Sequence, residues 1–226
     1  MELGYWPMKG AAEAIRFLLG YLNVPFTEYN PATPEAWQEK KKTLTFDFAN
    51  LPYLKDGDYY LSESSAIPLY IALKANRADV FGKDGKDQAI VRQIQGVLND
   101  IREGLWKVLM GAVPVEKFFA ADSTLVVKTN YLAKFLGEKD YFLGYLTYAD
   151  IEFTYFSHFL AVYAASLDQA NPVFAHANLK ALSERVSSQP GIKERVEASA
   201  DSAYVPAHYL KFKLLTWSEY LAKTSA

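Results

Sequence analysis

The chain has 226 residues with a formal net charge of −2; half of them are hydrophobic and 15% are aromatic, which is enough to bury a sizeable core and excludes a disordered chain. The near-neutral charge argues against a nucleic-acid-binding protein, which usually carries a basic face, and the absence of cysteine excludes disulfides, thiolate metal sites and a cysteine nucleophile. No apolar run approaches the roughly 20 residues of a membrane span, and the N-terminal segment shows no signal-peptide pattern, so we expect a cytoplasmic protein.

The first 76 residues predict a small sheet with helices on its faces. Apolar residues at helical spacing (Ile15, Leu18, Leu19 and Leu22) indicate the first helix, and the Asp56-Gly57-Asp58 turn indicates a hairpin. The predicted elements are, in order, a strand at 1–6, a helix at 11–23, a strand at 25–30, a helix at 34–44, strands at 51–55 and 59–63, and a helix at 64–76. This β-α-β-α-β-β-α order is typical of an α+β unit.

A loop rich in Gly, Asp and Lys at 78–86 predicts a boundary, with one domain at 1–77 and a second at 87–226. The second domain shows only helical periods. The predicted helices are 88–112, 115–137, one beginning near 147, 177–188 and 191–199. Thr147 and Asp150 have the spacing of a capping box, with Asp in place of the usual Glu.

Several kinds of chemistry leave no pattern in this sequence. No glycine-rich nucleotide fingerprint, Gly-x-Ser-x-Gly elbow or His-Glu-x-x-His motif is present. The three histidines lie far apart in the chain, so we expect no metal site.

Five spaced motifs resemble the cytosolic glutathione S-transferases, and the mu class most closely. They are LGYW at 3–6, AIRFLLGYL at 14–22, FDFANLPYL at 46–54, ESSAIPLYIA at 63–72 and LTYADI at 146–151. The resemblance covers nearly the whole chain. It implies a thioredoxin-like glutathione-binding domain followed by an all-helical domain that contributes the electrophile site.

In this family a tyrosine at the end of the first strand donates a hydrogen bond to the glutathione sulfur, and LGYW maps that role to Tyr5. A free thiol has a pKa of about 8.5 and is only about 3% thiolate at pH 7, so a fixed phenol donor that favours the anion has a large effect. The alternative reading of Tyr5 alone is an amphipathic residue at a strand end.

The family also implies how the rest of the tripeptide binds. Ser64, at the start of a helix, holds the γ-glutamyl carboxylate, and Glu63 takes the ammonium group. The peptide bond between Leu51 and Pro52 is cis in the family and turns the Leu51 backbone toward the cysteinyl residue. Without the family, the same residues read as an ordinary helix cap and a trans turn.

Further positions match mu-class contacts. Trp37, Lys41 and Asn50 correspond to the pocket for the glycyl carboxylate, and Trp6 to another glutathione contact. Phe48 corresponds to an aromatic residue inserted into the partner subunit, and Asp100 to a residue that reaches the partner's glutathione. The resemblance therefore implies a homodimer with two-fold symmetry.

This chain departs from the mu pattern at two places. The segment between Tyr29 and Trp37 is shorter and lacks the expected Arg, and Met110 stands where the mu class has a second tyrosine. The positions expected to contact the electrophile form a mostly apolar set: Met8, Ala11, Asn99, Met110 and Tyr209.

Together these residues predict an enzyme that conjugates the thiolate of glutathione to hydrophobic electrophiles, a detoxification activity, with no metal and no cofactor beyond the glutathione cosubstrate. Two alternatives stay open. One is a non-catalytic relative that keeps the fold and binds hydrophobic ligands; the other uses glutathione for isomerisation or peroxide reduction.

Overall fold

The computed structural model describes residues 1–205 and 213–225. By its internal contacts the chain divides into two compact units. Unit 1 comprises Met1–Ala78 and Pro190–Val205, and unit 2 comprises Asp79–Gln189 and Pro206–Ala226. In the described part of the chain no helix is long and apolar enough to cross a membrane.

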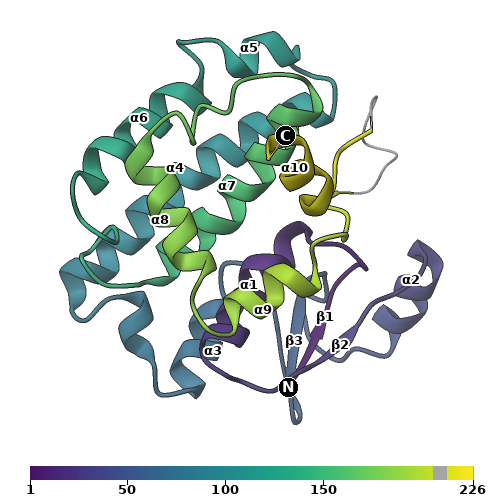
Figure 1. The fold of residues 1–226 in the computed structure, drawn as a ribbon. Helices are drawn as coiled ribbons and strands as arrows, with labels where there is room; N and C mark the ends of the chain where they lie inside the picture. Colours follow the sequence, from purple (N-terminus) through teal and green to yellow (C-terminus); the bar gives the residue numbers. More distant parts are fainter. Residues whose placement is uncertain (206–212, 226) are drawn as a thin grey trace. The chain divides into compact units, whose positions relative to one another are not determined.

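Unit 1 contains a four-stranded mixed sheet in the order β2-β1-β3-β4. Its elements are β1 (Glu2–Gly4), η1 (Gly10–Ala12), α1 (Glu13–Tyr21), β2 (Thr27–Tyr29), α2 (Pro34–Lys42), β3 (Tyr53–Asp56), β4 (Tyr59–Ser62), α3 (Ile67–Lys74) and α9 (Ile192–Ala198). β1 pairs parallel with β2 and antiparallel with β3, which pairs antiparallel with β4. Helices α1 and α3 cover one face of the sheet and α2 the other (Figure 1). The predicted β-α-β-α-β-β-α order is confirmed.

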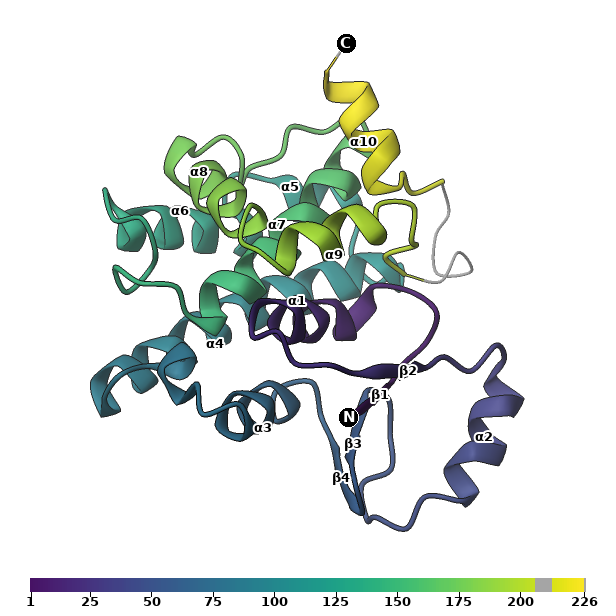
Figure 2. The same cartoon turned by 60° about the horizontal axis from the view of Figure 1, so that its bottom comes forward.

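Segment 190–205 returns to unit 1, although the predicted second domain ran from 87 to 226. Helix α9 packs against α1 (Figures 1 and 2). The two helices meet at glycines, since a Cβ built on Gly20 would lie 2.4 Å from the Gly191 carbonyl oxygen. Gly191 also has φ +79°, a conformation that favours glycine. Periodicity along one helix cannot reveal such a contact, because the contact depends on which surface the helix meets.

Unit 2 is all-helical among its described residues, as predicted. Its elements are α4 (Gly85–Leu109), α5 (Val115–Phe119), α6 (Thr124–Leu136), α7 (Tyr148–Ser166), α8 (Ala177–Ser187) and α10 (Trp217–Thr224), and the short η2 (Ala78–Phe81) spans the boundary with unit 1. Helix α7 packs against α4, α8 and α10, and most of its side chains are buried all round, which marks it as the core helix of the unit.

Two helix predictions need correction. The single helix expected at 115–137 is two helices, because α5 ends at Phe119, where Ala120 is extended, and Ser123 caps α6 by accepting a hydrogen bond from the Val126 N–H at 3.2 Å. Helix α10 was not predicted. By contrast, the capping box is confirmed: the Asp150 carboxylate accepts from the backbone N–H of Thr147 at 2.8 Å and from its hydroxyl at 2.7 Å.

Candidate functional site

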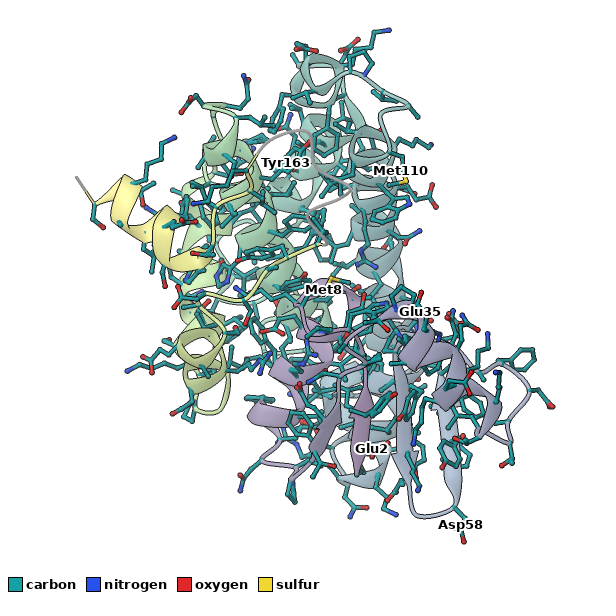
Figure 3. All side chains as sticks on the ribbon, turned by 90° about the vertical axis from the view of Figure 1, so that its right-hand side faces the viewer. Glu2, Met8, Glu35, Asp58, Met110 and Tyr163 are labelled. Carbon is teal, nitrogen blue, oxygen red and sulfur yellow. The ribbon has the colours of Figure 1, made fainter. Side chains whose placement is uncertain are left out.

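The predicted glutathione contacts of unit 1 gather at one end of the sheet. The strand register pairs Gly4 with Tyr53 and Tyr53 with Ser62. The residues just beyond these pairs are Tyr5, Leu51–Pro52 and Glu63–Ser64, so three segments that are distant in the sequence end side by side. Figure 3 shows Met8 at this end of the sheet and Asp58, at the tip of the β3–β4 hairpin, at the opposite end.

Tyr5 directly follows β1, and both its backbone and its hydroxyl are held. Its N–H donates to the Tyr29 carbonyl at 3.0 Å, and its phenol oxygen accepts from the Ala11 N–H at 3.0 Å. Gly10, with φ +43°, permits this approach, since a Cβ there would lie 2.5 Å from the phenol oxygen. A phenol has one hydrogen to donate. Because its oxygen already accepts from Ala11, the oxygen is fixed in place while the hydroxyl keeps its capacity to donate.

The Leu51–Pro52 peptide bond is cis, as the resemblance implied. Pro52 is buried, Leu51 is half-buried and Asn50 is exposed. The loop before them is fastened by Ser62, whose buried hydroxyl donates to the Phe48 carbonyl at 2.6 Å. Sequence reasoning missed Ser62, because nothing distinguishes it from its neighbouring serines until the loop is seen to fold back on the end of β4.

The turn from β4 into α3 presents unused backbone donors. The Glu63 carbonyl accepts from the N–H groups of Ala66 and Ile67, both at 3.0 Å. The N–H groups of Ser64 and Ser65 donate to no acceptor within residues 1–205 and 213–225. Free donors at the positive end of a helix dipole favour a carboxylate. Glu63 adopts φ +74°, an uncommon conformation for a residue with a side chain, and such strain clusters at functional sites.

Helix α2 carries the residues expected at the glycyl end of glutathione. The Trp37 ring stacks on Tyr53 with centroids 6.2 Å apart and is only 5% exposed, so most of it is core and little of it is available to a ligand. Three lysines follow. Lys42 pairs with Glu39, and the Lys40 ammonium lies 5.1 Å from the Tyr29 ring centroid. The ammonium of Lys41 has no partner in the described structure, which distinguishes it from its neighbours.

Apart from Phe48, which lies in the loop before β3, the remaining predicted contacts of unit 1 lie in or beside the loop after β1. Trp6 and Met8 are half-buried, and the Met8 N–H donates to the Trp6 carbonyl at 2.7 Å. Ala11 is exposed, so its methyl group can face a ligand while its N–H holds Tyr5. Phe48 is 78% exposed, which leaves most of its ring without cover in this chain.

In unit 2, three predicted site residues lie on or at the end of α4. Asn99 donates to Glu103 at 3.3 Å, and Asp100 forms an ion pair with Lys128 of α6 at 2.9 Å. Met110 follows the last turn and is 46% exposed; Figure 3 shows it at the surface. Tyr209 lies outside the described residues. No group of three or more metal-ligating side chains occurs in the described ranges.

Comparison with protein families finds two matches. The N-terminal domain model of glutathione S-transferase matches residues 1–73, and the C-terminal domain model matches residues 99–198. Among curated relatives, glutathione S-transferase 2 of Gallus gallus is 38% identical over 159 residues, which are 66% of this chain and 70% of the relative. Glutathione S-transferase Mu 2 of Homo sapiens is 32% identical over 166 residues, 67% and 75% of the two chains.

Solved structures agree on the fold. A Pi-class glutathione S-transferase of Onchocerca volvulus superposes with a TM-score of 0.71 at 22% identity, over 88% of this chain and 92% of the other. The rat hPGDS complexed with a quinoline superposes with a TM-score of 0.68 at 25% identity, over 87% and 96% of the two chains.

Proposed function

This chain belongs to the glutathione S-transferase family and is a transferase that conjugates glutathione, and on that premise we propose that Tyr5 stabilises the glutathione thiolate. The observation that carries the proposal is the hydrogen bond from the Ala11 N–H to the Tyr5 oxygen at 3.0 Å. It fixes the phenol at the end of the sheet and directs its single hydrogen away from Ala11.

A fixed donor acts on the thiol through its pKa. A hydrogen bond to the sulfur anion stabilises the thiolate and not the thiol, and each unit of lowered pKa corresponds to about 1.4 kcal/mol. Lowering the thiol pKa by about two units from its ordinary value of about 8.5 makes the thiolate the main form at pH 7. The bound anion is then held close to its electrophile, which supplies proximity as well as ionisation.

The rest of glutathione is held along the same end of the sheet. The N–H groups of Ser64 and Ser65 bind the γ-glutamyl carboxylate, and the Glu63 carboxylate binds the ammonium group. The backbone of Leu51 pairs with the cysteinyl residue. Lys41 and Asn50 bind the glycyl carboxylate beside the largely buried Trp37, while Trp6 flanks the peptide. Within the described residues the Lys41 ammonium has no partner and the Ser64 and Ser65 N–H groups have no acceptor, which supports this assignment.

The electrophile is a hydrophobic compound, and the protein acts in cytoplasmic detoxification. The half-buried thioether of Met8 and the exposed methyl group of Ala11 are its contacts in unit 1. Asn99 and Met110 are contacts in unit 2, and Met110 offers an adaptable apolar surface. Isomerisation or peroxide reduction would use the same thiolate, so a panel of aryl halides, enones, hydroperoxides and isomerisable ketones separates these activities.

The active protein is a homodimer. Phe48 leaves most of its ring uncovered in this chain, which supports its insertion into a partner. Asp100 reaches the partner's glutathione only when it exchanges its ion pair with Lys128 for the ligand's ammonium group. Both roles follow from the family resemblance, and the exposure of Phe48 is the observation that supports the first of them.

Replacing Tyr5 by Phe tests the mechanism directly. Tyr5→Phe removes the donor and keeps the ring, so we expect kcat with a model aryl halide to fall by about 100-fold, since one preorganised donor contributes about 10²–10³ in rate. Binding to immobilised glutathione should persist, because the other contacts remain. Turnover like that of the unmodified protein would refute the role of Tyr5.

A further inference from the structure

The loop between β1 and η1 is held by a buried charged cluster to which the proposed function gives no role. We call Glu13, Arg16, Glu28 and Arg195 the Arg16 cluster. The side chains of Glu13 and Arg16, both on α1, are 1% and 2% exposed. Burying charges costs several kcal/mol per ion unless each is paired, so such a cluster in a small unit calls for an explanation.

Arg16 connects the cluster to the loop backbone. Its Nε donates to the Glu28 carboxylate at 2.6 Å, and its Nη1 lies 3.0 Å from the Glu13 carboxylate. The same Nη1 lies 3.0 Å from the carbonyl oxygen of Met8 and 3.3 Å from that of Lys9. Nη1 of Arg16 therefore contacts two successive carbonyl groups of the loop, while the same planar group also pairs with the carboxylates of Glu13 and Glu28.

Arg195 completes the cluster from α9. Its Nε and Nη2 donate to the two oxygens of Glu13 at 2.9 and 2.8 Å, a bidentate pair. Although burial opposes ionisation of Glu13, its hydrogen bonds to Arg195 and the charges of both arginines hold the pKa of that carboxyl below its ordinary value. The cluster thus contains two cations and two anions, and each buried charge has a partner.

The segment after α9 holds the other side of the loop. The N–H groups of Lys9 and Gly10 donate to the carbonyls of Ala203 and Tyr204, at 2.8 and 3.0 Å. The Lys9 ammonium lies 4.1 Å from the centroid of the Tyr204 ring. The carbonyls of the loop are therefore held by Arg16 and its N–H groups by residues 203–204. The next N–H along the chain is that of Ala11, which holds the Tyr5 oxygen.

We propose that Arg16 and Arg195 are positioning residues for Tyr5, which fix the Met8–Gly10 loop so that the Ala11 N–H keeps the phenol oriented toward the glutathione sulfur. This rests on the proposed role of Tyr5. Neither arginine touches glutathione; each acts through the backbone. Segment 190–205 follows the helix α8 of unit 2 in the sequence. Through Arg195 and residues 203–204 it thus helps to position Tyr5.

Arg195→Gln is the first test. The Arg195 side chain is 25% exposed and that of Arg16 is 2% exposed, so replacing Arg195 should reduce the stability of the fold less. The readout is the pKa of the thiol of bound glutathione, followed by the ultraviolet absorbance of the thiolate as pH is varied. We expect Arg195→Gln to raise this pKa by about one unit, with kcat/KM at pH 6.5 falling about tenfold. The KM for glutathione should change less than about threefold, since no ligand contact is removed.

Three further variants sharpen this test. Arg16→Gln should have the larger effect if it folds, and Arg195→Lys, which keeps the charge without the bidentate fork, should fall between Gln and the unmodified protein. The matched control is Arg185→Gln. Arg185 pairs with Asp140 at 2.9 Å in unit 2 with similar exposure, 35%, so it tests the loss of an arginine–carboxylate pair alone and should leave the thiol pKa unchanged.

A double-mutant cycle with Tyr5→Phe separates the two proposals. If Arg195 acts through Tyr5, Arg195→Gln changes the thiol pKa in the unmodified protein and not in the Tyr5→Phe background. An equal change in both backgrounds, or no change in either, overturns the positioning role. If Tyr5→Phe itself leaves the thiol pKa unchanged, the proposed function fails instead, whatever the arginine variants do.

Discussion

The hydroxyl of Tyr5 is held by a residue whose side chain takes no part in the contact. Ala11 supplies only its N–H, and Gly10 supplies only the absence of a side chain: a Cβ there would lie 2.5 Å from the phenol oxygen. The position of the phenol oxygen is therefore set by backbone geometry between residues 5 and 11. A tyrosine at the end of a strand can thus be placed with the precision that the proposed hydrogen bond to sulfur requires.

Gly10→Ala should displace that oxygen. The φ of +43° at residue 10 is strained for alanine, and the new methyl group collides with the phenol of Tyr5. We therefore expect kcat/KM to fall at least about tenfold. Steady-state kinetics with glutathione as the varied substrate measures this fall in kcat/KM.

Gly57→Ala is the matched control for that substitution. Gly57 has φ +61°, but a Cβ there meets nothing within 4 Å, so it imposes similar backbone strain without touching Tyr5. Gly57→Ala should cost about 1 kcal/mol of stability and leave kcat/KM unchanged. Equal losses of activity in the two variants would show that general destabilisation, and not contact with Tyr5, is responsible.

Among the elements, α7 depends on a buried cap. Asp150 is fully buried, and besides its contacts with Thr147 it accepts from the Phe142 N–H at 2.9 Å, which ties the preceding loop to the helix start. Burial raises the pKa of the Asp150 carboxyl to about 6, against the hydrogen bonds from Phe142 and Thr147 that favour the anion. The core helix of unit 2 therefore begins at a titratable group.

The stability of the protein should reflect this titration. The unfolded pKa of Asp is about 3.9, so the contribution of Asp150 is fully present below about pH 4 and is lost as pH rises through 6. Relative to Asp150→Asn, whose side chain does not titrate, the unmodified protein should gain on the order of 3 kcal/mol between pH 7 and pH 4. Urea unfolding at both pH values, at one protein concentration, measures the difference in unfolding free energy between the unmodified protein and Asp150→Asn. A difference that is the same at both pH values, or that changes in the opposite direction, contradicts the raised pKa.

At the scale of the whole molecule, the chain crosses between its units more often than its sequence indicates. The chain leaves unit 1 near Ala78 and returns to it at Pro190. The return brings Arg195 to Glu13 and Gly191 to Gly20, contacts between residues more than 150 positions apart. Removal of everything after residue 189 would therefore expose two buried charges on α1 as well as an apolar surface.

The proposed dimer can be tested through Phe48. Because 78% of this side chain is exposed, Phe48→Ser removes little packing within the chain and should leave the thermal stability of the isolated monomer unchanged. If the ring inserts into a partner, the dimer dissociation constant should rise at least about tenfold, as analytical ultracentrifugation measures.

The control is Leu221→Ser, which removes another exposed apolar side chain, on α10, and should leave the dissociation constant unchanged. A monomeric unmodified protein, or a Phe48→Ser dimer as tight as the original, would remove Phe48 from the interface.

The sequence by itself determined the family, the order of elements in the first 76 residues, the helical character of unit 2 and the capping box at Thr147–Asp150. These features are local: hydrophobic periods, turn residues and short motifs are written in neighbouring positions. The same locality explains the errors. The break between α5 and α6 depends on an extended Ala120 and on Ser123 acting as a cap, and we recognised no signal for α10.

Only the tertiary structure decided which groups are held, and by what. It buried Trp37 against Tyr53, paired Asp100 with Lys128, and left Lys41 as the unpaired member of its lysine run in the described structure. It also assembled Glu13, Arg16, Glu28 and Arg195 around one loop. Charge pairing and burial depend on approach in space between distant segments, and no spacing along the chain encodes that distance.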